Sequence, residues 1–410
     1  MNQAQSGWQD EVLRELRGDG ASAPSPSGPG ATEAEAKAPL PVRDPDEQRP
    51  HPGQPRPPGD EPAATPVDVP EPEPEPRHSA RTPSQPSQHP GLRPAGPRSP
   101  NLPFRTPESV PTVDPRLALA LGKPLHGDSM ARRTGESIRR LTSSASQEVA
   151  EETRIGRELQ QPVTTGRVIA VTSIRGGVGK TTTAALLAST FNHYRHDPVL
   201  ALEADAALGT LPVRMGAESV RWSCGELAQI LTPSMQLTDI TGYLVPTSGG
   251  GWLLPAGQGR VGAPLDVRTY REVTLALRRY FAVTVVDCET LPGEVARTAM
   301  DTAHARVVVA PLTAEGVGGT RVVLDWLARL PHAALTSTVV ALTSGTPDPS
   351  LDLNTATAHL RETGVNVVHL PYDRHLAAGG PIRTELLGSA TRRAATRLAA
   401  EALQRAVRVR

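Results

Sequence analysis

The chain has 410 residues with 43 basic and 43 acidic side chains, and only 3% of its residues are aromatic. Of its 42 prolines, 27 lie within residues 1–115, where stretches such as 71–76 alternate glutamate with proline and offer no apolar side chain to bury. This composition excludes a uniformly globular chain and leaves about 250–290 residues for one or two folded domains.

Charge and cysteine content exclude several classes of protein. Residues 1–115 hold 11 basic and 17 acidic side chains, whereas residues 166–410 hold 24 and 20, a balance too even for a dedicated nucleic-acid module, whose pI is usually above ~9. Cys224 and Cys288 are too few for a disulfide framework or a four-thiolate metal cluster. No stretch approaches ~18 apolar residues and no signal peptide is recognisable. We therefore expect a cytoplasmic protein, with a peripheral place at a membrane complex as the open alternative.

The first 165 residues divide into two predicted regions. Residues 1–115 are predicted to be a disordered, proline-rich acidic tail. Within it, residues 8–16 are either a short helix that docks on a protein partner or plain disorder. Residues 116–165 are predicted to be a basic, partly helical linker, whose arginines form either a solvated helix face or a binding patch. The helical stripe of 8–16 consists of Trp8, Val12, Leu13 and Leu16, and the linker arginines are Arg132, Arg133, Arg139 and Arg140.

Apolar runs rich in β-branched residues alternate with helical stretches from Gly166 onward. Nearly continuous apolar runs are typical of strands buried on both faces of a parallel sheet. We therefore expect residues 166–410 to form one α/β domain, a doubly wound and mostly parallel sheet with helices on both faces. The expected strands are Val168–Thr172, Val199–Leu202, Val283–Val286, Val307–Ala310, Thr338–Leu342 and Val365–Leu370, and the expected helices include Thr182–Phe191, Val317–Leu330 and Ala390–Val407.

A glycine-rich loop follows the first expected strand and opens the first expected helix. Its glycines allow backbone N–H groups to close on phosphate oxygens, and the helix N-terminus adds partial positive charge. Lys180 is expected to reach the β- and γ-phosphates, and the Thr181 hydroxyl to bind Mg²⁺. The order of strand, glycine loop and helix therefore predicts the nucleotide site of a P-loop NTPase. The glycines are Gly176, Gly177 and Gly179.

The distribution of basic residues singles out Lys180. The chain has three lysines and 40 arginines, and Lys180 is the only lysine after residue 123. In a sequence so rich in arginine, a lysine at this position indicates that a compact ammonium is needed where a planar guanidinium does not fit.

Four segments resemble the ParA/MinD family of ATPases, whose deviant Walker A motif reads Lys-Gly-Gly-x-Gly-Lys-Thr/Ser. Residues 175–182 follow this pattern with an arginine in the first place. Residues 199–205 resemble the second strand and its Asp-x-Asp, residues 285–287 the Walker B strand, and residues 370–373 the Pro-Tyr-Asp segment beside the base. The resemblance covers roughly residues 166–405. The proline-rich tail adds a similarity to actinobacterial MinD-like proteins, some of which accompany type VII secretion systems.

The resemblance implies catalytic roles for Lys180, Asp205 and Arg175 and ATP and Mg²⁺ as cofactors. Asp205 would position the attacking water, unless it is a helix cap or turn, and Asp287 would hold Mg²⁺ through water, unless it is a strand-end carboxylate without a metal. Arg175 would cross a dimer interface to the partner subunit's phosphates, or else it only solvates the loop. The residues expected to contact the nucleotide are Gly176, Gly177, Val178, Gly179, Lys180, Thr181, Thr182, Pro371 and Asp373.

Three positions depart from the family pattern. Glu203 replaces the first aspartate of Asp-x-Asp, and Glu289 adds a carboxylate two residues after Asp287. Leu342-Thr343-Ser344 stands where the family usually offers an asparagine to the adenine, so base selectivity is open. An extra carboxylate near the phosphates would slow turnover, whereas one that faces away from the site would not matter.

The C-terminal residues 392–410 hold six arginines and one acidic residue. Their expected apolar face is mostly alanine, whereas insertion into a membrane interface requires Trp, Phe and Leu. We expect a last helix packed on the sheet, and a patch for DNA phosphates or a membrane anchor remain as alternatives.

Together these features predict a dimerising switch that binds and hydrolyses ATP with Mg²⁺ and controls the localisation or assembly of a partner complex, with type VII secretion as one setting. Hydrolysis is expected to be slow and stimulated by a partner, and the tail is expected to bind a protein. Two alternatives are a nucleotide-holding adaptor with negligible turnover and a DNA-partitioning ATPase, whose affinity for DNA would be salt-sensitive.

Overall fold

The structure is a computed structural model that describes residues 106–120, 122–129, 145–206, 209–258, 265–329 and 331–409. The predicted docking helix at 8–16 and most of the predicted tail lie outside the described residues. The four linker arginines that were predicted to form a solvated face or a patch, at positions 132, 133, 139 and 140, lie outside them as well.

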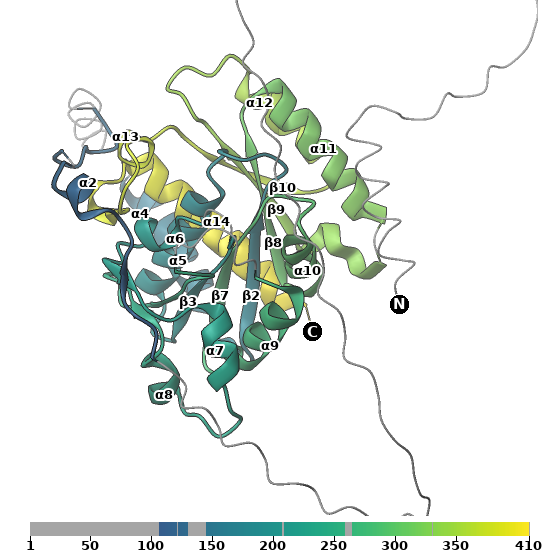
Figure 1. Cartoon of the computed structure of the whole chain (residues 1–410). Coiled ribbons are helices and arrows are strands. Elements are labelled where there is room, and N and C mark those ends of the chain that lie inside the picture. The colour runs from purple at the N-terminus through teal and green to yellow at the C-terminus, as the bar shows by residue number, and fades with distance from the viewer. Residues whose placement is uncertain are drawn as a thin grey trace, which may run out of the picture. The chain divides into compact units, whose positions relative to one another are not determined.

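An eight-stranded sheet forms the centre of the domain, in the order β10-β9-β8-β2-β7-β3-β6-β5 (Figure 1). Its neighbouring strands are parallel except for β5, which pairs antiparallel with β6 at the edge. The predicted mostly parallel α/β fold is therefore confirmed. The strands are β2 (Arg167–Thr172), β3 (Val199–Ala204), β5 (Val245–Pro246), β6 (Trp252–Leu254), β7 (Val283–Cys288), β8 (Ala305–Pro311), β9 (Thr338–Thr343) and β10 (Asn366–Leu370).

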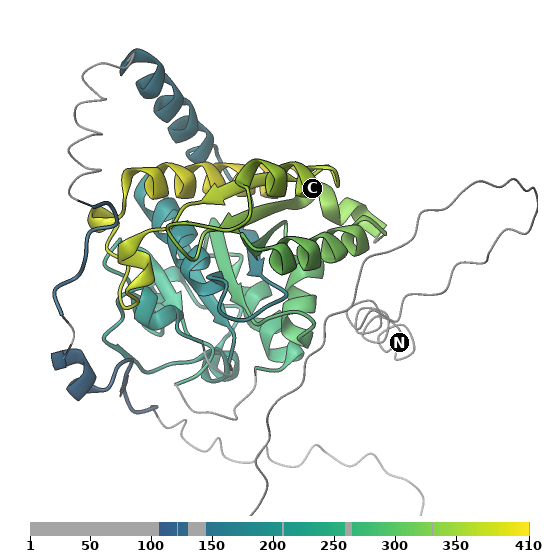
Figure 2. The same ribbon diagram turned by 90° about the horizontal axis from the view of Figure 1, so that it is seen from above.

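Helices cover both faces of this sheet (Figures 1 and 2). Because side chains alternate along a strand, Ile169 and Val171 of β2 enter one core, whereas Val168 and Ala170 enter the other. The first core is closed by α4 (Ala145–Leu159), α5 (Lys180–Tyr194) and α14 (Ser389–Arg408). The second core is closed by α7 (Cys224–Ile230), α8 (Leu237–Thr241), α9 (Val267–Leu277), α10 (Glu294–Thr302), α11 (Ala314–Arg329) and α12 (Leu353–Arg361).

Short elements connect the longer ones. They include α6 (Leu211–Arg214), α13 (Arg374–Ala377) and the 3-10 helices η1 (Pro331–Ser337) and η2 (Thr384–Leu386). The Arg214 guanidinium donates to the carbonyls of Leu376 and Gly380, at 3.1 and 3.3 Å. These bonds join α6 to α13, although the two helices are far apart in the sequence.

Residues 106–120 and 122–129, here called the strap, are tied to the domain at two places. β1 (Val110–Pro111) pairs antiparallel with β4 (Ser219–Val220), and α2 (Pro115–Ala120) follows it without a buried residue. Farther along, the Asp128 carboxylate accepts a hydrogen bond of 3.0 Å from the Ser389 N–H, in the first turn of α14. The predicted boundary between tail and linker, at residue 115, falls inside the strap.

The last helix, α14, packs on the sheet as expected. Every residue of its expected apolar face is buried, with an exposed fraction of 3% or less. This face is therefore part of the core and is not available to a membrane. No helix among the described residues combines the length and the apolar character that crossing a bilayer requires. The buried face consists of Ala395, Leu398, Ala399, Ala402, Leu403 and Ala406.

Candidate nucleotide site

The glycine loop joins β2 to α5 at the carboxyl end of the sheet. Gly177 and Gly179 have φ of 76° and 93°, a left-handed conformation that favours glycine, and they turn the chain into the helix. A Cβ added at Gly176, Gly177 or Gly179 would meet no atom within 4 Å. The loop therefore leaves open space in front of the N-terminus of α5, as an anion-binding loop requires.

Hydroxyl groups bond to the loop at two places and join the end of β2 to the segment after β7 at a third. Ser173 Oγ donates to the Arg175 carbonyl at 2.7 Å, and Thr172 Oγ1 donates to the Glu289 carbonyl at 2.9 Å. Thr343, which stands where the family offers an asparagine to the base, has its hydroxyl 3.0 Å from the carbonyl of Val178 in the loop. Sequence reasoning missed the supporting roles of Ser173 and Thr172, whose one signal is a pair of hydroxyl residues at the end of an apolar strand.

Lys180, Asp205 and Asp287 converge beneath the loop from three different elements. Lys180 begins α5, Asp205 follows β3, and Asp287 lies near the end of β7. The Lys180 Nζ is 3.8 Å from Asp205 Oδ2, and the exposed fractions of these two side chains are 9% and 21%. Asp287 is fully buried, and neither of its carboxylate oxygens has a hydrogen bond of standard geometry.

Burial dominates the electrostatics of Asp287. Loss of water raises its pKa from 3.8 to about 7, and the nearby Asp205 carboxylate raises it further, whereas the Thr181 hydroxyl and the Lys180 ammonium lower it. A buried carboxylate whose charge is compensated only in part favours an arriving cation, because a cation supplies the remaining compensation.

Glu203 is paired with Asp287 across β3 and β7 but is bonded differently. Its Oε1 accepts from the Leu211 N–H at 3.0 Å and its Oε2 from the Ala256 N–H at 3.2 Å. Burial still raises the pKa of Glu203 to about 8, despite these two bonds. Glu203 therefore anchors the segment that follows Asp205, so the departure from Asp-x-Asp has a structural consequence.

Glu289, the second departure, faces α10 rather than the glycine loop. Its Oε1 accepts from the backbone N–H groups of Val295 and Ala296, at 3.1 and 3.5 Å. A carboxylate at a helix N-terminus is favoured by the unpaired N–H groups there. Of the two interpretations of Glu289, the structure supports the one in which the carboxylate faces away from the phosphates.

Asp373, predicted to contact the nucleotide, is 3% exposed and engaged in capping. Its Oδ1 accepts from the N–H groups of His375 and Leu376 at the start of α13, and its Oδ2 accepts from the Gly388 N–H at 2.8 Å. Pro371 is half-buried just after β10. The structure does not bring the Asp373 carboxylate to the cluster of Lys180, and its contact with a nucleotide stays a prediction.

Arg175 is exposed at the crest of the loop. The pKa of Glu315, at the start of α11, is lowered by hydrogen bonds from its own backbone N–H and from the Thr313 hydroxyl, and also by the Arg175 guanidinium. The Arg175 guanidinium is thus close enough to the N-terminus of α11 to act on the charge of Glu315, and its exposed side chain is accessible to a second molecule.

The residues present fit a magnesium nucleotide. The open loop offers backbone N–H groups to phosphate oxygens, and Lys180 adds a charge beside them. Mg²⁺ is usually bound through one or two protein oxygens together with phosphates and water. The Thr181 hydroxyl and the unpaired oxygens of Asp287 are the protein groups that would hold it.

Comparison with known proteins gives one curated relative in two strains. No protein-family model matches the chain. The ESX-1 secretion-associated protein EspI of Mycobacterium tuberculosis, strains CDC 1551 and H37Rv, is 30% identical over 240 residues. The match covers 57% of this chain but 35% of EspI, so this chain spans about a third of the length of its relative.

Solved structures with a similar fold include a ParA family ATPase and a MinD protein. A ParA family ATPase from Chlorobium tepidum is 12% identical with a TM-score of 0.47, over 57% of this chain and 98% of that one. The septum site-determining protein MinD from Pyrococcus horikoshii, complexed with Mg-ADP, is 22% identical with a TM-score of 0.45, over 57% of this chain and 94% of that one. The fold itself follows from the sheet order and the glycine loop described above. These two structures are named as a ParA family ATPase and a MinD protein, and the phosphate loop of this chain resembles the motif of the ParA/MinD family.

Proposed function

We propose that this chain is an ATP- and Mg²⁺-dependent dimerising switch that controls the localisation or assembly of a partner complex. The observation that carries the proposal is the convergence of Lys180, Asp205 and Asp287 beneath an open glycine loop. A lysine, a half-exposed carboxylate and a buried carboxylate without hydrogen bonds are the groups that phosphoryl transfer to water requires.

Each of these side chains has a distinct task in the proposed reaction. The Lys180 ammonium compensates the charge of the β- and γ-phosphates. Bound Mg²⁺ would neutralise further phosphate charge, and Thr181 and Asp287 are the residues that would hold it. Asp205, 21% exposed, orients the attacking water, and Arg175 reaches across the dimer to the phosphates of the second subunit.

The proposed setting comes from the relative. EspI is named as an ESX-1 secretion-associated protein, and the 240 matched residues correspond in length to an ATPase domain. We therefore propose that the switch serves a secretion complex at the cytoplasmic side of a membrane, and that a protein partner binds the N-terminal tail.

Calorimetric titration of Mg-ATP into the full chain tests the nucleotide site. Lys180→Ala is expected to weaken binding about 10–100-fold, because hydrogen bonds to charged groups contribute about 1.5–3 kcal/mol. Lys123→Ala is the matched control, since Lys123 is exposed on the strap and removes the same charge elsewhere. Equal affinities for both variants would show that the loop is not the site.

Mixing two inactive variants tests the dimer. If Arg175 acts across the interface, a heterodimer of Arg175→Ala and Asp205→Ala subunits has one site with both defects and one intact site. Random mixing then restores about a quarter of the wild-type turnover, because half of the dimers are mixed and each has one of its two sites intact. Confirmed heterodimers without turnover would show that Arg175 and Asp205 act in the active site of their own subunit.

Turnover with and without DNA and liposomes separates the remaining alternatives. A nucleotide-holding adaptor binds Mg-ATP but hydrolyses it negligibly under all conditions. A DNA-partitioning ATPase is stimulated by DNA, and its affinity falls steeply between low and high salt. The exposed arginines of α14, such as Arg392 and Arg393, are the observation that keeps the second alternative open.

A further inference from the structure

A groove lies between α4, α5 and the N-terminal half of α14, on the opposite side of the α5 helix from the sheet core and apart from the nucleotide site. Its volume is about 460 Å³. The floor is apolar and is formed mainly by Ile155, Leu186, Leu387 and Ala395. One wall, from α14, carries arginines at 392, 393 and 397, and the other wall, from α4, carries glutamates at 151 and 152.

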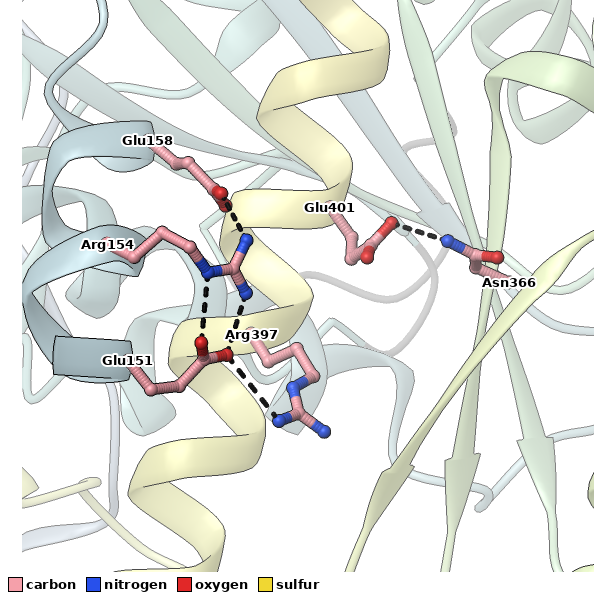
Figure 3. A network of polar contacts seen from close by, with 6 residues as sticks. All are labelled: Glu151, Arg154, Glu158, Asn366, Arg397 and Glu401. Atoms are coloured by element: carbon pink, nitrogen blue, oxygen red, sulfur yellow. Dashed lines mark hydrogen bonds and ion pairs between the residues drawn. The ribbon is translucent and has the colours of Figure 1, made fainter. Parts of the chain in front are cut away.

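The two walls meet where the Glu151 carboxylate lies 3.9 Å from the Arg397 guanidinium (Figure 3). On the α4 side, Arg154 bonds both Glu151 and Glu158, at 2.7 and 2.6 Å. All of these groups except Glu158 are more than 40% exposed. Exposed ion pairs contribute little to stability, so this network orients α4 without holding it firmly.

Residues 149–154 of α4 add little to the packing of the domain. They include no buried side chain, and among the α4 side chains whose burial is described, from 149 onward, Ile155 and Leu159 enter the core. Val149, one turn before Glu152, is 60% exposed. A helix of 15 residues is marginal without packing of an apolar face, and Figure 2 shows its N-terminal end leading away from α14. Apart from Ile155 on the groove floor, the described side chains of α4 that line the groove are therefore not buried against the domain.

We propose that residues 8–17 of the same chain bind in this groove as a short amphipathic helix. In helical register, Trp8, Val12 and Leu16 share one stripe with Leu13 at its edge, which matches the apolar floor. Glu11 and Glu15 lie one turn apart on one flank of that stripe and face the arginine wall of α14. Arg17 lies on the other flank and faces the glutamates of α4.

The length of chain allows this contact. Residues 18–105 provide a linker of 88 residues, which can bridge about 50 Å even as a compact coil. A domain of this size has a radius of gyration of about 18 Å, so every point on its surface is within reach. An effective concentration near the millimolar range for such tethers makes even a weak docking contact populated.

Cross-linking in the full chain tests the contact. Gln9 lies within the apolar stripe, so Gln9→Cys combined with Ser189→Cys in the groove is expected to cross-link rapidly with a short bismaleimide. Leu275→Cys with Gln9→Cys is the control, because Leu275 is 67% exposed on α9, on the other face of the sheet. The native Cys224 and Cys288 are buried and should not react.

A charge exchange makes the test specific. Arg392→Glu is expected to slow the Gln9–Ser189 cross-link several-fold, and Glu11→Arg added to it is expected to restore the rate. Equal rates at Ser189 and Leu275 in a chain with unchanged melting would overturn the proposal, as would a charge exchange that fails to restore the rate. Cross-links that form only between separately labelled molecules would also overturn it, because they would identify a second copy as the occupant.

Discussion

Replacing the buried Asp287 by asparagine should stabilise the nucleotide-free protein while removing its Mg²⁺-dependent binding of ATP. The asparagine side chain has nearly the shape of the carboxyl group and no charge. Because neither oxygen of Asp287 has a hydrogen bond of standard geometry, the substitution removes the cost of a buried charge and breaks no such bond.

The magnitude follows from the pKa of Asp287. A carboxyl group whose pKa rises from 3.8 in the unfolded chain to about 7 in the fold disfavours folding by up to about 4 kcal/mol at pH 8. Wild-type stability therefore falls as the pH rises from 4 to 7, because the folded state binds the proton more tightly. Relaxation and water entry reduce the figure, so we expect Asp287→Asn to be more stable by about 2–4 kcal/mol at pH 8 and by only about 1–2 kcal/mol at pH 5, where the folded carboxyl is protonated but the unfolded one is still ionised.

Scanning calorimetry at pH 5 and pH 8 measures this difference. For a domain of about 250 residues, 2–4 kcal/mol corresponds to a rise in Tm of roughly 5–15 °C. Asp348→Asn, in an exposed loop, removes the same formal charge and should leave Tm unchanged at both pH values. A variant that is less stable than the wild type at pH 8, or a difference that does not vary with pH, would refute the reasoning.

Three further predictions concern groups outside that carboxylate. Burial lowers the pKa of His304 to about 4, so the free energy of unfolding should decrease as the pH falls from 6.5 to 4, by at most ~1.4 kcal/mol per pH unit. Urea titration of His304→Asn should show a free energy of unfolding that depends less on pH. Thr343→Val should lower the free energy of unfolding by about 1 kcal/mol and weaken ATP binding several-fold in calorimetry. Thr338→Val, on the same strand, should lower the free energy of unfolding by a similar amount and leave the affinity for ATP unchanged. Asp128→Ala should lower stability by about 1 kcal/mol through the lost cap of α14, which thermal melting against Asp348→Ala would detect.

The sequence determined those features that depend on residues close together in the chain. The six predicted strands are all present, because continuous runs such as 307–310 can be buried only between two layers of helices. The loop from Arg175 to Thr181 could be predicted as a unit, since its glycines, its lysine and its hydroxyl act within one turn of the chain. By contrast, β6 (Trp252–Leu254) has only three residues, too few for a periodic pattern.

Only the tertiary structure decided the task of each carboxylate. Asp287, Glu203 and Asp373 all follow or end strands at the same edge of the sheet, and their spacing does not distinguish them. Asp287 has no backbone N–H group in reach, whereas two such groups meet Glu203 and three meet Asp373. Those donors come from distant segments, and which of them arrive at a given carboxylate depends on the packing of the whole chain. A carboxylate that the fold leaves without donors is free to bind a cation, and one that the fold surrounds with N–H groups becomes part of the framework.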